Sequence, residues 1–105
     1  MNRLTVEGTL KHGLTLEGQA QKDFVLREAL AEDLFAAEGD ASPDRPMTFR
    51  SALLARQLVS LGTYTGPFTL AMIGKLRAAD ITVLMNKQRE LDALGEDEQP
   101  GSETA

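Results

Sequence analysis

Hydrophobic and polar positions alternate along the first quarter of the chain. From Leu4 to Leu16 the even positions are mostly apolar, with His12 as the exception, and the odd positions are mostly threonine, glutamate and lysine. A period of two is typical of a strand with one buried face. After a turn, Phe24 and Leu26 point inward from a second predicted strand. The pattern predicts a β-hairpin or small meander, which must pack against helices because an isolated hairpin is marginal in water.

Helical spacing replaces this alternation further along the chain. Four helices are predicted, over residues 29–39, 48–61, 68–76 and 78–94. Amphipathic helices gather apolar residues on one face, and two such faces are visible: Ala52, Leu54, Ala55, Leu58, Val59 and Leu61 on one helix, and Ile81, Leu84, Met85, Gln88 and Leu91 on another. Thr48 and Gly62 have the residue types favoured at the N-cap and just past the C-terminus of a helix. The predicted fold class is α+β, with an N-terminal β-hairpin or small meander packed on three to four α-helices.

Charge divides the chain into two parts. The net charge of the 105 residues is −5, but four acidic residues and no basic residue lie in 95–105, which leaves residues 1–94 at −1. This predicts a single domain over 1–94 and a disordered acidic tail over 95–105. A nucleic-acid partner is not expected without a basic stripe, nor is a membrane span without about 20 successive apolar residues. Without cysteine or a signal peptide, we expect a soluble intracellular protein.

The sequence offers no catalytic constellation. The pair Gly74-Lys75 is not a phosphate-binding loop, because Leu76 follows where that motif needs serine or threonine. The single histidine, His12, has no acid or nucleophile predicted beside it. We therefore predict no catalytic, cofactor or metal site and no enzymatic activity.

Asp80 lies near the start of the last predicted helix. With Arg77 as N-cap, Asp80 occupies the third helical position, where a carboxylate meets unpaired backbone N–H groups. We interpret Asp80 as a helix-start residue rather than a binding residue.

Aromatic and methionine side chains gather around the helix 48–61 and the turn after it. Such side chains are enriched at the centres of interfaces, but in a domain with five aromatic residues they also supply the core. Both interpretations stay open at this point. Our hypothesis is a partner-binding surface made of Phe49, Leu53, Tyr64, Phe68 and Met72.

The order of several short motifs resembles the tail assembly chaperones of long-tailed bacteriophages, in the Mu-like group. The motifs are Gly13-Leu14, Arg27 followed by Asp33-Leu34, Ala55-Arg56 with Leu61-Gly62, and Leu76 with Asp80. Each motif is short and common, so the resemblance rests on their order and spacing over about residues 8–94.

The resemblance implies a non-enzymatic protein that binds the long, largely helical tape measure protein and keeps it soluble during tail assembly. It implies a location in the bacterial host cytoplasm and absence from the mature virion. The tail tube protein and further copies of the chain are additional candidate partners. The alternative is a small regulatory or antitoxin-like interaction module. An enzyme fragment is disfavoured because no acid–base or metal constellation is visible.

Overall fold

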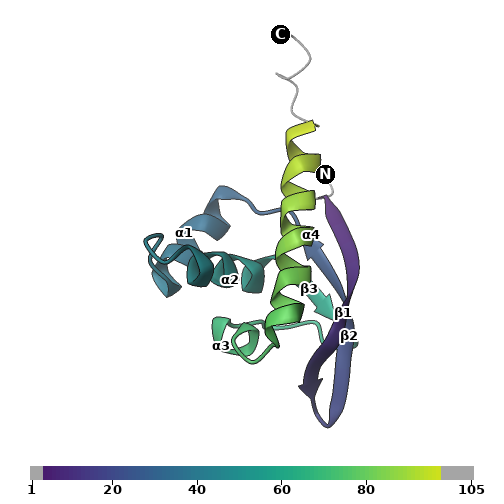
Figure 1. The fold of residues 1–105 in the computed structure, drawn as a ribbon. Helices are drawn as coiled ribbons and strands as arrows, with labels where there is room; N and C mark the ends of the chain where they lie inside the picture. The colour runs from purple at the N-terminus through teal and green to yellow at the C-terminus, as the bar shows by residue number, and fades with distance from the viewer. Residues whose placement is uncertain (1–3, 98–105) are drawn as a thin grey trace.

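A computed structural model describes residues 4–97 as a three-stranded sheet with helices on one of its faces (Figure 1). This arrangement confirms the predicted α+β class, with an N-terminal hairpin followed by helices. The elements in chain order are β1 (Thr5–Leu16), β2 (Gln19–Arg27), α1 (Ala31–Asp40), α2 (Pro46–Gln57), β3 (Leu58–Leu61), α3 (Leu70–Ile73) and α4 (Ala78–Asp97).

The sheet is antiparallel, in the order β1-β2-β3. Its hairpin turns through Glu17 and Gly18, both at positive φ (52° and 80°). Two successive positive φ angles are typical of the type I′ turn, whose twist matches that of the flanking strands. The turn therefore sets the pairing of β1 with β2.

A large irregularity interrupts β1 in its middle. The partners of Thr9 and Leu14 are Asp23 and Gln21, so five residue steps on β1 stand opposite two on β2. Gly13 accommodates the distortion with a φ of 82°. His12, which the alternation placed on the buried face, is exposed because the bulge removes it from the regular pleat. That detail of the strand prediction was wrong.

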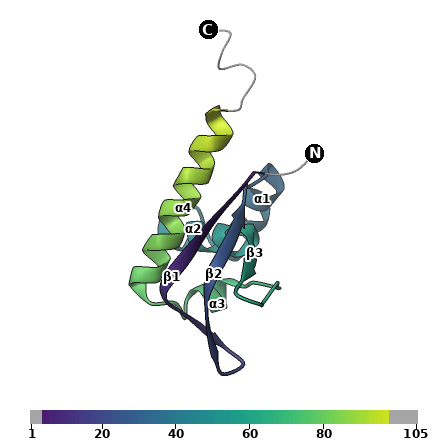
Figure 2. The ribbon, with the colours of Figure 1, turned by 90° about the vertical axis from the view of Figure 1, so that its right-hand side faces the viewer.

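The hydrophobic core lies between the sheet and the helices. Helix α4 packs along β1, and α2 lies between α1 and α4 in both views (Figures 1 and 2). Most of the predicted inward positions are confirmed. The main cluster contains Val6, Leu10, Leu14, Phe24, Leu26, Leu54, Ala55, Leu58, Leu61, Ile73, Leu84, Met85 and Leu91.

The predicted helix 48–61 was wrong at both ends. Helix α2 begins at Pro46 with Arg45 before it, so Thr48 is not the cap; proline suits the first position because its missing N–H would have no intrahelical partner. After Gln57 the chain becomes β3 and pairs with β2. Val59, assigned to the buried arc, is 42% exposed as a result.

Other boundaries also differ from the prediction, and the helix predicted over 68–76 is only the short helix α3, Leu70–Ile73, with Thr69 as its N-cap. Gly62 follows a strand rather than a helix, and its N–H donates to the carbonyl of Asp23 at 2.6 Å. Helix α4 continues to Asp97, three residues past the predicted domain boundary at Leu94. The remainder of the predicted tail, 98–105, lies outside the described residues.

Candidate functional site

Asp33 is the centre of a buried ion cluster that joins α1, β2 and α2. Its carboxylate, 1% exposed, accepts two hydrogen bonds from the guanidinium of Arg27, at 2.8 and 3.0 Å. Arg56 on α2 donates a third from Nε, at 3.0 Å. The N–H of Leu30 donates a fourth, at 2.8 Å, and so the carboxylate also caps the start of α1. One side chain therefore fixes three elements.

The charge of Asp33 is held in place by these partners. The hydrogen bonds from Arg27 hold the pKa of the Asp33 carboxyl well below its usual range, against the opposing effect of burial. The N–H of Leu30 and the guanidinium of Arg56 act in the same direction. The bond to Asp33 raises the pKa of Arg27 in turn. The cluster is thus a structural ion pair network in which Arg27 and Asp33 stabilise each other's charged form.

Asp80 is a second buried carboxylate, and its partners are all main-chain groups. Fully buried at 0% exposure, it accepts hydrogen bonds from the N–H groups of Lys11 (2.7 Å), His12 (3.2 Å) and Gly13 (2.9 Å). These are the residues of the β1 bulge, whose N–H groups converge on one anion as in a backbone nest. The bond therefore joins the first turn of α4 to the middle of β1.

This geometry corrects our interpretation of Asp80. The residue does occupy the first turn of α4, but its carboxylate reaches across to β1 instead of capping its own helix. Burial by itself raises the pKa of Asp80, and the bonds from His12, Gly13 and Lys11 more than offset it, so that the pKa lies below its ordinary value. Asp80 therefore forms a tertiary contact between α4 and β1. We call its hydrogen bonds with the N–H groups of Lys11, His12 and Gly13 the clamp.

A chain of buried amides connects α2 to α4 and β2. The Nε2 of Gln57 donates to the carbonyl of Arg27 at 3.1 Å, and the Nε2 of Gln88 donates to Oε1 of Gln57 at 2.8 Å. The Nε of Arg50 donates to Oε1 of Gln88 at 3.1 Å. Satisfied polar networks of this kind fix the relative position of the elements that they join. Here they hold α2 beside α4.

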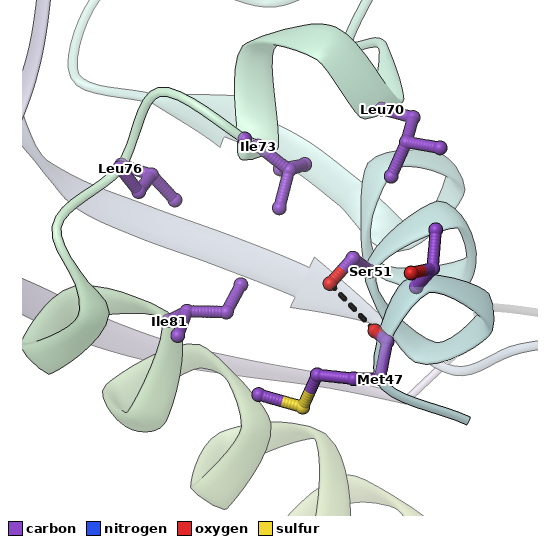
Figure 3. A pocket seen from close by; sticks show the side chains of 8 residues that line it. Met47, Ser51, Leu70, Ile73, Leu76 and Ile81 are labelled. Carbon is purple, nitrogen blue, oxygen red and sulfur yellow. Dashed lines mark hydrogen bonds between the residues drawn. The ribbon is translucent and has the colours of Figure 1, made fainter. Parts of the chain in front are cut away.

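An open apolar groove lies where α2, α3 and the first turns of α4 meet. It has a volume of about 390 Å³ and is lined by Met47, Thr48, Ser51, Leu70, Ile73, Gly74, Leu76 and Ile81. The labelled apolar side chains point into this space (Figure 3). The hydroxyl of Ser51 donates to the carbonyl of Met47 at 2.9 Å, which satisfies that polar group internally. The groove therefore presents a mainly apolar surface.

The five residues of the predicted partner-binding surface are divided between two places. Phe49 and Leu53 are half-buried on α2, one turn apart. Tyr64 and Phe68 form an edge-to-face pair after β3, with ring centroids 5.1 Å apart. Phe68 and Met72 also pack against the core cluster. None of the five lines the groove, and their role in binding stays a prediction.

Sequence reasoning missed the most exposed apolar side chains. Phe35 on α1 is 69% exposed and Met47 at the start of α2 is 58% exposed, with Leu30 and Leu34 near 40%. A signal was present for Phe35, since no large apolar residue lies three or four positions away from it in this helix. Met47 lies before the predicted helix 48–61, so the sequence offered no reason to place it on a helix face.

Metal and membrane chemistry find no support in the part of the chain that is described. Among residues 4–97 no group of three or more histidine, aspartate or glutamate side chains is placed to hold a metal ion. No helix in the same range is long and apolar enough to span a bilayer. Among residues 4–97, the groove between α2, α3 and α4 is a hollow with a mainly apolar lining.

The described residues form a small α+β domain with an open, mainly apolar groove. The chain belongs to the family described as tail assembly protein gp41, of Mu-like phage, which it matches over residues 10–101. No curated protein and no solved structure matches it. The resemblance seen in the sequence is confirmed, and its signature residues have physical roles: Arg27, Asp33 and Arg56 form one polar cluster, and Gly13 and Asp80 form the other.

Proposed function

We propose that this tail assembly protein is a non-enzymatic chaperone that binds the tape measure protein and keeps it soluble until the tail tube assembles. The observation that carries the proposal is the apolar groove between α2, α3 and α4, on a chain of the tail assembly family. In this proposal the chain acts in the host cytoplasm and is absent from the finished virion.

The chemistry of the groove suits an amphipathic helix. A long helical protein whose sheath has not yet formed exposes apolar stripes that promote aggregation. An apolar groove covers such a stripe by accepting side chains spaced three and four residues apart. Met47, which lines the groove and is 58% exposed, has the flexible side chain that adapts to different partners. One groove could therefore hold several stretches of a repetitive helical partner.

Co-expression with the tape measure protein of the same phage tests this function. We expect the chain to raise the soluble fraction of the tape measure protein and to co-purify with it. Met47→Glu places a charge in the groove and should weaken the complex about tenfold or more, without unfolding the chain because the side chain is largely exposed. Leu94→Glu is the matched control, since Leu94 is an exposed leucine, 40% accessible, near the far end of α4.

Each result has a definite meaning. A tape measure protein that aggregates equally with and without the chain would overturn the proposed function. If the complex forms but Phe49→Ser with Leu53→Ser weakens it while Met47→Glu does not, the binding surface is on the side of α2 predicted from sequence rather than in the groove.

A further inference from the structure

The segment between Gly66 and Gly74 is attached to the rest of the protein differently from the longer helices. It consists of residues 67–73, which include α3, and we call it the flap. In the part of the chain that the structure describes, its hydrogen bonds reach no further than Tyr64 on one side and Leu76 on the other. Within that part, no hydrogen bond or ion pair joins the flap to a strand or to α1, α2 or α4.

Each longer helix, by contrast, is joined to its neighbours by buried polar groups. Asp33 joins α1 to β2 and α2, and Asp80 joins α4 to β1. Gln57 and Gln88 join α2 to α4. Separation of any of these helices would leave buried polar groups without partners, at a high cost in free energy. Separation of the flap breaks no such contact among the described residues.

Apolar side chains hold the flap against the body of the protein. Ile73, which is 5% exposed, belongs to the core cluster, and Phe68 and Met72 pack partly against that cluster. Leu70 and Ile73 also line the groove, across from Ile81 (Figure 3). A segment with few buried apolar contacts can open locally while the rest of a protein stays folded.

Glycines at both ends of the flap give the backbone freedom that such an opening needs. Gly66 has a φ of 111°, in a region that favours glycine. Gly74 has an ordinary helical φ of −63°. A Cβ at Gly74 would lie 3.4 Å from its nearest neighbour, the carbonyl oxygen of Ala71, which is an ordinary contact. The closed state therefore does not require glycine at position 74, whereas a hinge favours a small residue there.

We infer that the flap opens on these two hinges while the sheet, α2 and α4 stay in place, and that the groove is the closed form of a wider apolar cleft. Opening withdraws Leu70 and Ile73 and uncovers the sides of α2 and α4 that face them. The area of apolar surface that the chain presents therefore depends on the position of the flap. This inference concerns the chain by itself and does not depend on the proposed function.

Thiol labelling tests the inference, because the chain has no cysteine of its own. Ile73→Cys places a thiol on the flap and Met85→Cys places one on α4, and both positions are 5% exposed. We expect iodoacetamide to modify the first variant at least about a hundredfold faster than the second. Low concentrations of urea should leave the faster rate unchanged, because opening of a short segment exposes little surface, and should raise the slower rate.

Gly74→Ala, added to Ile73→Cys, tests the hinge. Alanine fits the closed state and has fewer conformations than glycine once the flap is released, so labelling should slow about two- to fivefold. Gly39→Ala is the matched control, because Gly39 lies in α1 and no atom lies within 4 Å of a Cβ placed there. This control should leave the labelling rate unchanged.

Hydrogen exchange of the unmodified chain is a second measurement that needs no variant. The amides of Ile73 and Gly74, which donate to the carbonyls of Thr69 and Leu70, should exchange much faster than those of β2 and should not respond to low urea. Equal labelling of the two thiols, with the same dependence on urea, would overturn the inference. So would α3 amides that exchange only on global unfolding, or a labelling rate that Gly74→Ala does not change. Because no tape measure protein is present, these results are independent of the test of the proposed function.

Discussion

Asp33 and Asp80 are both buried carboxylates, but the protein stabilises their charges by different means. Asp33 is held by the guanidinium groups of Arg27 and Arg56 and by one backbone N–H. Asp80 accepts hydrogen bonds from three backbone N–H groups of the β1 bulge, and within residues 4–97 no cationic side chain forms a hydrogen bond or ion pair with it. The side chains of Arg27 and Arg56 are 21% and 42% exposed. If Asp33 is lost, water can therefore form hydrogen bonds with these two arginines instead. The donors to Asp80 belong to β1, and the shape of that strand depends on their hydrogen bonds to Asp80.

The comparison separates a bond between side chains from a bond that supports a backbone conformation. Loss of the Asp33 carboxylate leaves two arginines that can turn toward solvent, so the free energy of unfolding should fall only moderately. Loss of the second leaves three main-chain donors without their acceptor beneath the first turn of α4. Buried donors that lose their acceptor bear the full desolvation penalty. We therefore expect the two sites to differ in the size of their effects and in their response to charge and salt.

The largest effect should come from Asp80→Ala. We expect a loss of about 3 kcal/mol in the free energy of unfolding, because three donors lose their acceptor together. Asp80→Asn should cost less than Asp80→Ala but more than Asp33→Asn, because the amide keeps one acceptor oxygen while its NH₂ group faces a backbone N–H donor that cannot turn away. Urea unfolding measures both changes. Glu90→Ala is the control on the same helix and should change stability by a few tenths of a kcal/mol, because Glu90 forms an exposed pair with Lys87. A loss below about 1 kcal/mol for Asp80→Ala would contradict the clamp.

Gly13→Ala should have the next largest effect and tests the bulge directly. A Cβ at Gly13 would lie 2.6 Å from the carbonyl oxygen of Gln21 and 2.8 Å from Cγ of Lys22. Gly18→Ala is the matched control, since its φ is nearly the same (80° against 82°) and no atom lies within 4 Å. Both variants bear the left-handed strain of about 1 kcal/mol. We expect unfolding measurements to show a clearly larger loss at Gly13, and equal losses would mean that the bulge yields easily.

Asp33→Asn should cost less than either change at Asp80. The amide keeps one acceptor oxygen for Leu30 or an arginine, and the arginines can reach water. We expect a loss of about 2 kcal/mol by chemical unfolding. If the Asp33 variant is less stable than the Asp80 variant, our distinction between the two sites is wrong.

Both carboxylates should make stability depend on pH in the acid range. Each has a pKa below its ordinary value of about 3.9 in the unfolded chain. A depressed folded pKa means that the unfolded state binds more protons, so stability is present above about pH 4 and is lost as pH falls through the folded values. Unfolding midpoints measured from neutral pH downward should show this decline. Asp33→Asn and Asp80→Asn should each flatten it.

The smallest expected effect is the response to salt. Added NaCl should reduce the cost of Asp33→Asn by a few tenths of a kcal/mol, because one of its cationic partners is well exposed. The cost of Asp80→Asn should hardly change, since its donors are neutral backbone N–H groups. Repeating the urea series at low and high salt compares the two directly.

Local patterns predicted most of the fold. Alternation located the hairpin and its inward residues Phe24 and Leu26, and helical spacing located α4 with its buried face. Strand β3 was not predictable, because Leu54, Leu58 and Leu61 fit a helical arc as well as a strand. The pairing of Leu58 and Leu61 with β2 decides the matter, and no local signal encodes it.

The candidate site was less predictable because it depends on distant contacts. Asp80 accepts hydrogen bonds from residues 67 to 69 positions away in the sequence. The helix-start interpretation considered only the residues next to Asp80 in the sequence, and so it missed these partners. The groove draws its lining from three separate elements. The motifs that supported the resemblance did contain the residues of both polar clusters, although nothing in the sequence showed that they meet.

The main-chain origin of the donors to Asp80 bears on how freely this part of the protein can change. Every residue except proline supplies an N–H group, so the side chains of Lys11 and His12, both exposed, are dispensable for the clamp. A saturation mutagenesis screen should accept most residue types at these two positions and reject proline. At Gly13 and Asp80 the same screen should accept few. This contact among four residues thus restricts amino-acid identity at Gly13 and Asp80, and leaves Lys11 and His12 in the bulge of β1 free to vary.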